Sequence, residues 1–156
     1  MSSDAPGFEL PLRLLLAFRA LIDELHAELS RQGHPDIRPM HGFVMQAIGP
    51  QGTTAVELGR TLGVSKQAAG KTIDALERIG YVERTTDPDD TRRKIVRLTP
   101  YGLDALGRSA RIFDTLRARW AVELGEDRLR ALESDLRKLT PANPWRLDMP
   151  GWFGSL

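Results

Sequence analysis

The chain has 156 residues, a formal net charge of +1 and an apolar content of 41%, which is typical of one soluble globular domain. It contains no cysteine, so disulfides, thiolate metal sites and thiol-based redox sensing are excluded. No apolar run approaches the roughly twenty residues of a membrane span, and residues 1–6 lack the basic start and apolar run of a signal peptide. We therefore expect a single domain in the cytoplasm, with no membrane contact.

A first helix is predicted between Pro11 and Gly33. Apolar residues recur there at spacings of four, three, four and four, which places them on one helical stripe: Leu14, Phe18, Leu21, Leu25 and Leu29. Such a stripe has to be buried against another surface. A second, shorter helix is predicted from Met40 to Ile48, before the Gly49 and Pro50 turn.

The next segment predicts a helix that begins with a capping box. In Thr54-Ala55-Val56-Glu57 the threonine hydroxyl and the glutamate carboxylate each satisfy a backbone donor at a helix start. Ala55, Leu58 and Leu62 then lie on the inner face, and Gly63 ends the helix with a left-handed residue.

A following helix is capped by Ser65 and ends near Gly80. Its inner face carries Ala69, Ile73 and Leu76, and its outer face carries Gln67, Lys71 and Asp74. Two short helices joined by a tight turn, the second with a polar outer face, form the helix-turn-helix arrangement.

A β-hairpin and long helices complete the pattern. Strands are predicted at residues 81–85 and 95–98 on either side of a polar loop, residues 87–94, which is too long for a tight turn and reads as an exposed wing. Thr99-Pro100 starts another helix. Its apolar series extends over about six turns and comprises Leu103, Leu106, Ala110, Phe113, Leu116, Trp120 and Leu124. Leu129, Leu132, Leu136 and Leu139 continue the series in a final helix.

Charge and side-chain chemistry in the central segment favour nucleic-acid contact. From Arg60 to Arg97 there are nine Lys or Arg against six Asp or Glu, an excess that the net charge hides. Small residues on the helix after Ser65 allow close approach to a groove, Gln67 can pair with an adenine edge, and its lysines can reach guanine or phosphate. The predicted readers are Ser65, Lys66, Gln67, Ala68, Gly70 and Lys71.

The wing carries a basic tip. Arg92, Arg93 and Lys94 suit phosphates or a narrow minor groove, whose negative potential attracts guanidinium groups. We expect Asp87 or Asp90 to bridge to one of these arginines and to hold the shape of the tip.

Taken as a set, these motifs resemble the MarR (multiple antibiotic resistance regulator) family. The resemblance rests on Glu57-Leu58-Gly59-Arg60, Val64-Ser65-Lys66-Gln67, Leu76-Glu77-Arg78-Ile79-Gly80-Tyr81-Val82, Asp87-Pro88-Asp89-Asp90-Thr91-Arg92-Arg93-Lys94 and Leu98-Thr99-Pro100-Tyr101-Gly102. The chain departs from the commoner pattern at Gly70, where a larger residue is frequent, and in its aromatic C-terminal tail.

The resemblance implies a mainly α fold with a small β-hairpin wing. It implies a winged helix-turn-helix over residues 40–99 and helices for homodimerisation over residues 8–33 and 100–140. The tail, residues 141–156, carries Trp145, Trp152 and Phe153, which are costly to leave in water, so we expect it to dock on the dimer. The implied function is a cytoplasmic transcriptional repressor that binds a double-stranded DNA operator with inverted-repeat symmetry and is released by a small-molecule effector. Phe43, Met45 and Trp120 are the candidate effector-pocket residues, with core packing as their alternative role.

Other functions are less well supported by the sequence. A metal-responsive regulator would use His26, His34 and His41, but their spacings of eight and seven match no compact ligand motif. A winged module for protein or RNA contact is a further alternative, although Tyr81 is the sole aromatic residue between Gly49 and Thr99. No motif indicates a catalytic site or a cofactor.

Overall fold

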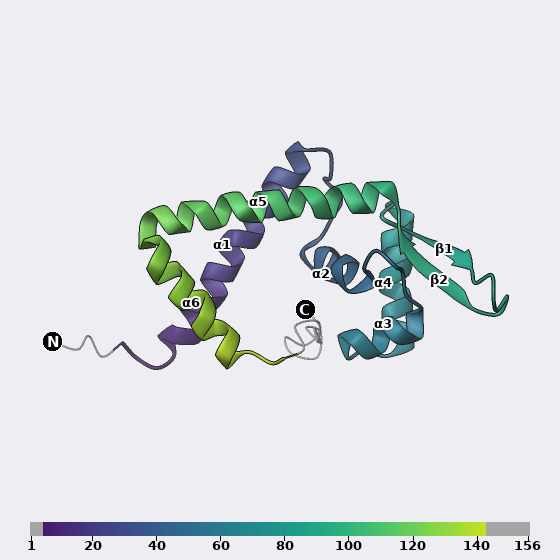
Figure 1. The fold of residues 1–156 in the computed structure, drawn as a ribbon, viewed down its shortest axis with the longest axis horizontal. Helices are drawn as coiled ribbons and strands as arrows, with labels where there is room; N and C mark the ends of the chain where they lie inside the picture. The colour runs from purple at the N-terminus through teal and green to yellow at the C-terminus, as the bar shows by residue number, and fades with distance from the viewer. Residues whose placement is uncertain (1–4, 143–156) are drawn as a thin grey trace.

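The structure is a computed structural model in which residues 5–142 are described. It is mainly helical with one antiparallel hairpin (Figure 1). The elements in chain order are α1 (Glu9–Arg31), α2 (Pro39–Ile48), α3 (Ala55–Leu62), α4 (Lys66–Arg78), β1 (Val82–Thr86), β2 (Lys94–Leu98), α5 (Pro100–Leu124) and α6 (Glu126–Leu139). The predicted fold class, a mainly α fold with a β-hairpin wing, is confirmed.

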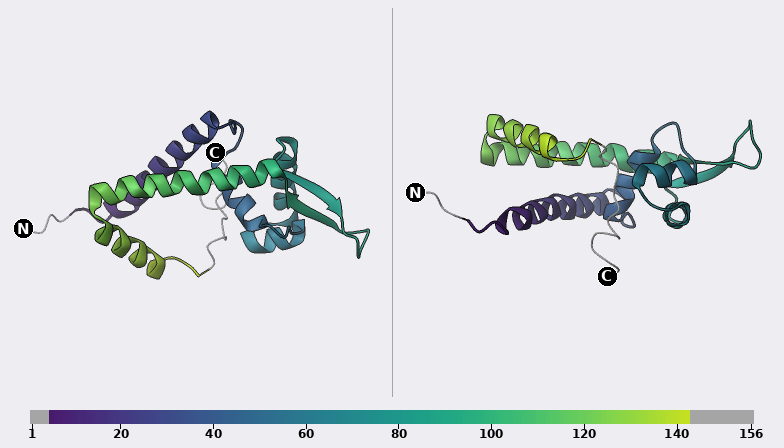
Figure 2. Two further views of the ribbon diagram at one scale, coloured as in Figure 1. Left: turned by 45° about the horizontal axis from the view of Figure 1, so that its top comes forward. Right: turned by 90° about the horizontal axis from the view of Figure 1, so that it is seen from below.

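The elements form two parts that α5 connects. At one end of α5, the helices α2, α3 and α4 pack together and the hairpin projects away from them (Figure 1). At the other end α6 turns back from α5, and Figure 2 shows α1 in a separate layer from α5 and α6. None of the helices within residues 5–142 is both long enough and apolar enough to span a membrane.

Local capping explains where α3 and α4 begin. The Thr54 hydroxyl accepts from the Glu57 N–H (3.2 Å), and the Ser65 hydroxyl accepts from the Ala68 N–H (3.1 Å). Between the two helices Gly63 takes the left-handed conformation, with φ 72°. The Glu57 carboxylate does not complete the expected capping box, because it accepts instead from Thr53 Oγ1 and from Arg93.

The hairpin pairs Val82 with Leu98 and Thr86 with Lys94. An isolated bridge from Thr53 to Val96 attaches the hairpin to the segment before α3. The first strand begins one residue later than predicted, because the Tyr81 N–H donates to the Leu76 carbonyl at the end of α4 (2.9 Å) rather than to a strand.

One contiguous core joins the two parts. It is made of the inner faces of α1 to α4 with the hairpin and α5, and its most deeply buried side chains are Leu29, Met45, Leu58, Ile73, Leu76, Tyr81, Val82 and Val96. The predicted inner residues of α4, Ala69, Ile73 and Leu76, are all buried.

The long helices are only partly covered within this chain. In α5 the buried stripe consists of Gly102, Ala105, Ser109, Ile112 and Leu116. Of the predicted apolar series in α5 only Leu116 belongs to that stripe, because the stripe is offset from most of the series by one residue, about 100° around the helix. In α1, Leu25 and Leu29 are buried, whereas Leu14 and Phe18 are 44% and 41% exposed.

The predicted docking of the tail concerns residues 141–156. Apart from residues 141 and 142, these lie outside the described residues. The aromatic residues on which that prediction rests, Trp145, Trp152 and Phe153, are among those outside it.

Candidate nucleic-acid interface

The outer face of α4 is open to solvent. Lys66, Gln67, Ala68 and Lys71 are exposed, and Gly70 is half-buried with nothing within 4 Å of the position a Cβ would take. Ser65 is also exposed, but its hydroxyl already caps the helix. The small residues thus leave the backbone of α4 accessible along the side that carries Gln67.

An open hollow of ≈ 840 Å³ lies between α3, α4 and the wing. It brings together three of the predicted readers, Lys66, Gln67 and Gly70, with the predicted wing residues, whereas Ala68 and Lys71 are exposed outside it. Its charged lining consists of six basic and two acidic side chains: Arg60, Lys66, Arg84, Arg92, Arg93, Lys94, Glu57 and Asp90. Such an excess of positive charge in a concave surface attracts polyanions.

The three basic residues of the wing tip have different surroundings. Arg93 Nη2 donates to Glu57 Oε1 (2.7 Å), and Arg93 Nε lies 3.9 Å from Asp87 Oδ2, so this guanidinium joins the wing to α3. Lys94 Nζ donates to Thr86 Oγ1 across the hairpin (2.9 Å). Within residues 5–142, the Arg92 guanidinium has neither an ion pair nor a hydrogen bond.

The two predicted supporting aspartates shape the loop mainly through its backbone. Asp87 Oδ1 accepts from the Asp89 N–H (2.9 Å), and Asp90 Oδ1 accepts from the Arg92 N–H (3.0 Å). Only Asp87 also approaches an arginine side chain, that of Arg93. Each bond closes an Asx turn, in which an aspartate side chain accepts from the backbone N–H two residues later. Such turns give the loop a defined shape without a two-residue hairpin turn.

Sequence reasoning did not single out Arg60 and Arg84. Arg84 donates to Asp74 (2.7 Å) and to Glu77 (2.9 Å), which ties β1 to the outer face of α4. Arg60 follows Val56 by one helical turn, and both line the hollow. Residues four apart lie on the same face of a helix. The position of Arg60 four residues after Val56 is therefore the sequence signal that would have placed it on this face of α3.

A buried polar cluster connects the end of α1 to the start of the wing. His34 is 1% exposed, with Nδ1 2.9 Å from the Tyr81 hydroxyl and Nε2 2.8 Å from Asp104 Oδ2. Hydrogen bonds from Arg108 and then from His34 lower the pKa of Asp104, so this carboxylate only accepts. His34 Nε2 therefore donates to Asp104, and Nδ1 shares a hydrogen bond with the Tyr81 hydroxyl, whose pKa burial raises.

The other two histidines are half-buried near α2. His41 Nδ1 accepts from the Arg38 N–H (3.1 Å), and burial lowers the pKa of both His26 and His41. Across residues 5–142 there is no group of three or more His, Asp or Glu that could hold a metal ion. The three histidines of the metal hypothesis are thus not gathered into one ligand set.

The predicted effector-pocket residues do not share a cavity. Phe43 lines a small hollow of ≈ 90 Å³ between α1, α2 and α5. Trp120 lines a different one between α1 and α5, and Met45 is fully buried in the core. Phe43 and Met45 lie on different sides of α2, and Trp120 lies on α5, so their apolar character did not show that they are apart.

Comparison with known proteins places this fold. Residues 36–93 match the model of the MarR family. The structure is similar to apo wild-type MarR from E. coli, with 26% identity, coverage of 88% of this chain and 98% of that one, and a TM-score of 0.63. The central segment of this chain, from α2 into the wing, is thus similar to the MarR family.

Two further relatives extend the comparison. FabT from Streptococcus pneumoniae, solved in complex with DNA, has a TM-score of 0.72 at 19% identity, covering 86% of this chain and 94% of that one, which shows the shared fold. The HTH-type transcriptional regulator YcgE of Bacillus subtilis (strain 168) is 40% identical over 53 residues. That match spans 34% of this chain and only 33% of YcgE.

Proposed function

We propose that this chain is a DNA-binding transcriptional regulator of the MarR family. The observation that carries the proposal is the single hollow that α3, α4 and the wing line together, with six basic and two acidic side chains. Nucleic-acid affinity depends strongly on neutralising phosphates, and the hollow gathers the basic side chains beside a helix that small residues leave open. The proposal assigns no catalytic residue and no cofactor.

The two sides of the hollow have different roles in this proposal. α4 enters the major groove, where Gln67 pairs with an adenine edge and Lys66 and Lys71 reach guanine or phosphate. The wing lies along the adjacent minor groove, with Arg92 as its contact because this guanidinium has no partner among residues 5–142. A MarR variant from E. coli, 27% identical to this chain with a TM-score of 0.64 over 89% of this chain and all of that one, was solved with operator DNA.

The regulator is proposed to act as a homodimer. Large apolar side chains are exposed at the start and along the first half of α1 and on α5 and α6: Phe8, Leu10, Leu12, Leu14, Leu15, Leu16, Phe18, Phe113, Val122, Leu124, Leu132 and Leu139. An exposed apolar surface of this extent marks an interaction site. A second copy would cover it and place two α4 helices on the two halves of an inverted repeat.

The placement of two α4 helices on two half-sites would also allow DNA binding to be regulated. A small-molecule effector that shifts the long helices would move both α4 helices off their half-sites, and a coupling free energy of about 1–3 kcal/mol is enough for such control. We propose that the chain represses transcription until the effector binds. The alternative, a winged module for protein or RNA contact, uses the same fold without reading duplex DNA.

Competition between nucleic acids tests the proposal against its alternative. The full chain is titrated into a labelled pool of random duplex DNA, followed by fluorescence anisotropy, with unlabelled duplex or single-stranded RNA as competitor. We expect the duplex to compete at lower concentration than the RNA, and Gln67→Ala to bind the unselected pool as wild type does. Stronger competition by RNA would replace the proposal with the alternative.

A further inference from the structure

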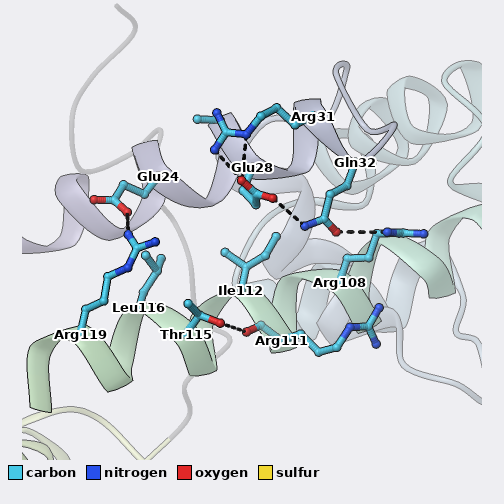
Figure 3. Close-up of a pocket in the computed structure, with 11 residues that line it drawn as sticks. Glu24, Glu28, Arg31, Gln32, Arg108, Arg111, Ile112, Thr115, Leu116 and Arg119 are labelled. Carbon is cyan, nitrogen blue, oxygen red and sulfur yellow. Dashed lines mark hydrogen bonds and ion pairs between the residues drawn. The ribbon is translucent and has the colours of Figure 1, made fainter.

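The two long helices α1 and α5 are joined by polar contacts at two levels (Figure 3). Arg119 of α5 pairs with Glu24 of α1 (2.7 Å), and about three turns away Arg108 donates to Gln32 at the end of α1 (3.1 Å). Both helices also contribute side chains to the buried core. α1 and α5 therefore act as one body, the stem, which is distinct from the winged part, residues 39–98.

Four side chains form a junction where the stem meets the winged part: His34, Tyr81, Tyr101 and Asp104. His34 follows α1, Tyr81 precedes β1, and the other two lie near the start of α5. His34 Nδ1 lies 2.9 Å from the Tyr81 hydroxyl, and Nε2 lies 2.8 Å from Asp104 Oδ2. One buried imidazole thus connects the end of α1, the start of α5 and the winged part.

Tyr101 stacks on both of the other rings in this junction. Its ring centroid lies 4.4 Å from that of His34 and 4.6 Å from that of Tyr81, with interplanar angles of 28° and 16°. Its hydroxyl donates to the Gly33 carbonyl (2.6 Å). Tyr101 therefore holds α5 against the winged part with its ring and against the end of α1 with its hydroxyl.

The contacts of the junction are directional. Hydrogen bonds weaken steeply when their angles change, and aromatic rings prefer a defined offset and separation. Elsewhere the stem and the winged part share the apolar core, and apolar burial has no preferred direction. A buried polar network with satisfied partners is the kind of contact that specifies one arrangement among several of similar apolar burial. The junction is thus suited to fix the angle between the two bodies.

A small change of this angle has a large effect at a distance. α5 has 25 residues and so extends over about 37 Å. A rotation of about 5° at the junction would displace the far end of α5 by about 3 Å, which is close to the rise of one base pair, about 3.4 Å. In the proposed dimer, where the stems pair, such a rotation would change the separation of the two α4 helices by a similar amount.

We propose that the junction of His34, Tyr81, Tyr101 and Asp104 determines which half-site spacing the protein accepts, because it fixes the angle between the winged part and the stem. The four side chains are positioning residues, since none of them lines the hollow between α3, α4 and the wing. The proposal rests on the proposed DNA-binding function. It goes beyond that function because it concerns the distance between half-sites and not the bases within them.

Spacing variants of the selected operator test this role. The full chain is titrated by fluorescence anisotropy against the selected inverted repeat and against duplexes with one base pair more or one fewer between the half-sites. For wild type we expect at least about tenfold weaker binding to either altered duplex, because the DNA has to be deformed to present both half-sites.

Two variants loosen the junction without removing a large apolar side chain. Tyr81→Phe keeps the buried ring and removes its hydroxyl, and Asp104→Ala removes a carboxylate that is 44% exposed. Both should reduce the spacing penalty to about threefold or less, while the cost of a substituted base within a half-site stays as in wild type. Ser109→Ala is the matched control, because this buried hydroxyl donates to the Ala105 carbonyl within α5 (2.8 Å). It should keep the full spacing penalty.

A distance measurement without DNA tests the junction by itself. The chain has no cysteine, so spin labels on Arg78→Cys of α4 and Ala118→Cys of α5, both exposed positions, are unique. Doubly labelled chain is diluted into excess unlabelled chain, so that pulsed electron paramagnetic resonance records distances within one protomer. We expect one narrow distribution for wild type and for Ser109→Ala. In Tyr81→Phe and Asp104→Ala it should be broadened or displaced by about 3 Å.

The outcomes separate the proposal from the function on which it rests. Unchanged distance distributions in both junction variants would overturn the fixing of the angle, whether or not the chain binds DNA. If wild type reads an operator and both variants keep its full spacing penalty, the spacing role alone is overturned. If wild type binds no duplex, the proposed function fails and the spacing role fails with it.

Discussion

Two glycines of the winged part have opposite tolerances for a side chain. Gly70 lies inside α4 with open space around a would-be Cβ, whereas a Cβ on Gly102 would overlap the Tyr81 carbonyl oxygen. Glycine inside a helix costs about 1 kcal/mol relative to alanine. Gly70 therefore lowers the stability of α4 without any steric need, while Gly102 is required for the approach of α5 to Tyr81.

We predict that Gly70→Ala raises the free energy of unfolding by about 1 kcal/mol. Gly102→Ala, the matched substitution, should lower it by about 1–3 kcal/mol, because the backbone has to shift to accept the methyl group. Urea unfolding followed by circular dichroism measures both. Equal effects of the two substitutions would mean that the described packing of α5 on Tyr81 is wrong.

At the wing tip, Arg92 and Arg93 should differ in how they affect DNA binding. Arg92→Ala is expected to weaken binding and to reduce the log–log salt slope by about one, as the loss of one phosphate contact does. Arg93→Ala should weaken binding while keeping the slope, because Arg93 positions the wing through Glu57.

The control for this difference is Glu57→Gln, which removes the carboxylate that pairs with Arg93. Glu57→Gln and Arg93→Ala should have similar effects, and the double variant should bind no more weakly than either one, which is the sign of a shared interaction. Anisotropy titrations at several salt concentrations give all four affinities. A reduced slope in Arg93→Ala equal to that in Arg92→Ala would make Arg93 a phosphate contact instead.

Among elements, those with local signals were predictable and those that depend on distant partners were not. Thr54, Gly63 and Ser65 set the limits of α3 and α4 through contacts within a few residues, which the sequence pattern shows directly. The pairing of Arg93 with Glu57 joins residues 36 apart, and that of His34 with Asp104 joins residues 70 apart. No local sequence pattern encodes a pair so far apart. The expected capping role of Glu57 was wrong because its carboxylate pairs with Arg93 instead.

The packing of α1 against α2 should make stability depend on pH. Burial lowers the pKa of His26 and of His41 in the native chain. In the unfolded chain both imidazoles take up a proton near pH 6.5, so the unfolded chain binds more protons than the native chain below that pH. The free energy of unfolding is thus unaffected above that pH and falls as the pH decreases below it. Carboxylates with lowered pKa act in the same direction only at more acidic pH.

We predict that the free energy of unfolding decreases as the pH falls from about 6.5 to about 5.5, and that it decreases less steeply when His26 and His41 are both replaced by glutamine. Denaturant titrations at a series of pH values measure this dependence. Identical slopes for wild type and for the double variant would show that these two histidines are not buried in the native protein.

In the molecule as a whole, the sequence predicted two long apolar stripes but could not show which parts of them this chain covers itself. The structure buries Leu25 and Leu29 against the winged part and leaves the first half of α1 exposed. The buried stripe of α5 is formed partly by glycine, alanine and serine, which hydrophobic periodicity overlooks. The exposed faces are therefore the surfaces on which the proposed dimer depends.

Replacing Leu12 and Leu16 with glutamate should convert the proposed dimer to a monomer. These leucines lie one turn apart on α1 and are 43% and 47% exposed in the single chain, so the substitution costs the monomer little but buries unpaired charges in a dimer. Sedimentation velocity measures the mass. Val56→Glu, an equivalent substitution on α3, should leave the dimer intact, and a monomeric wild type would contradict the proposal.

Selection of sequences from a pool of random duplex DNA by the purified chain shows whether it reads an operator. We expect an inverted repeat whose half-sites are centred roughly one helical turn, about 34 Å, apart. We also expect two protomers per duplex and an affinity that falls with salt by about 0.9 log units per neutralised phosphate. Binding that is indifferent to sequence, or one protomer on a single half-site, would contradict the claim that paired α4 helices and wings read an operator.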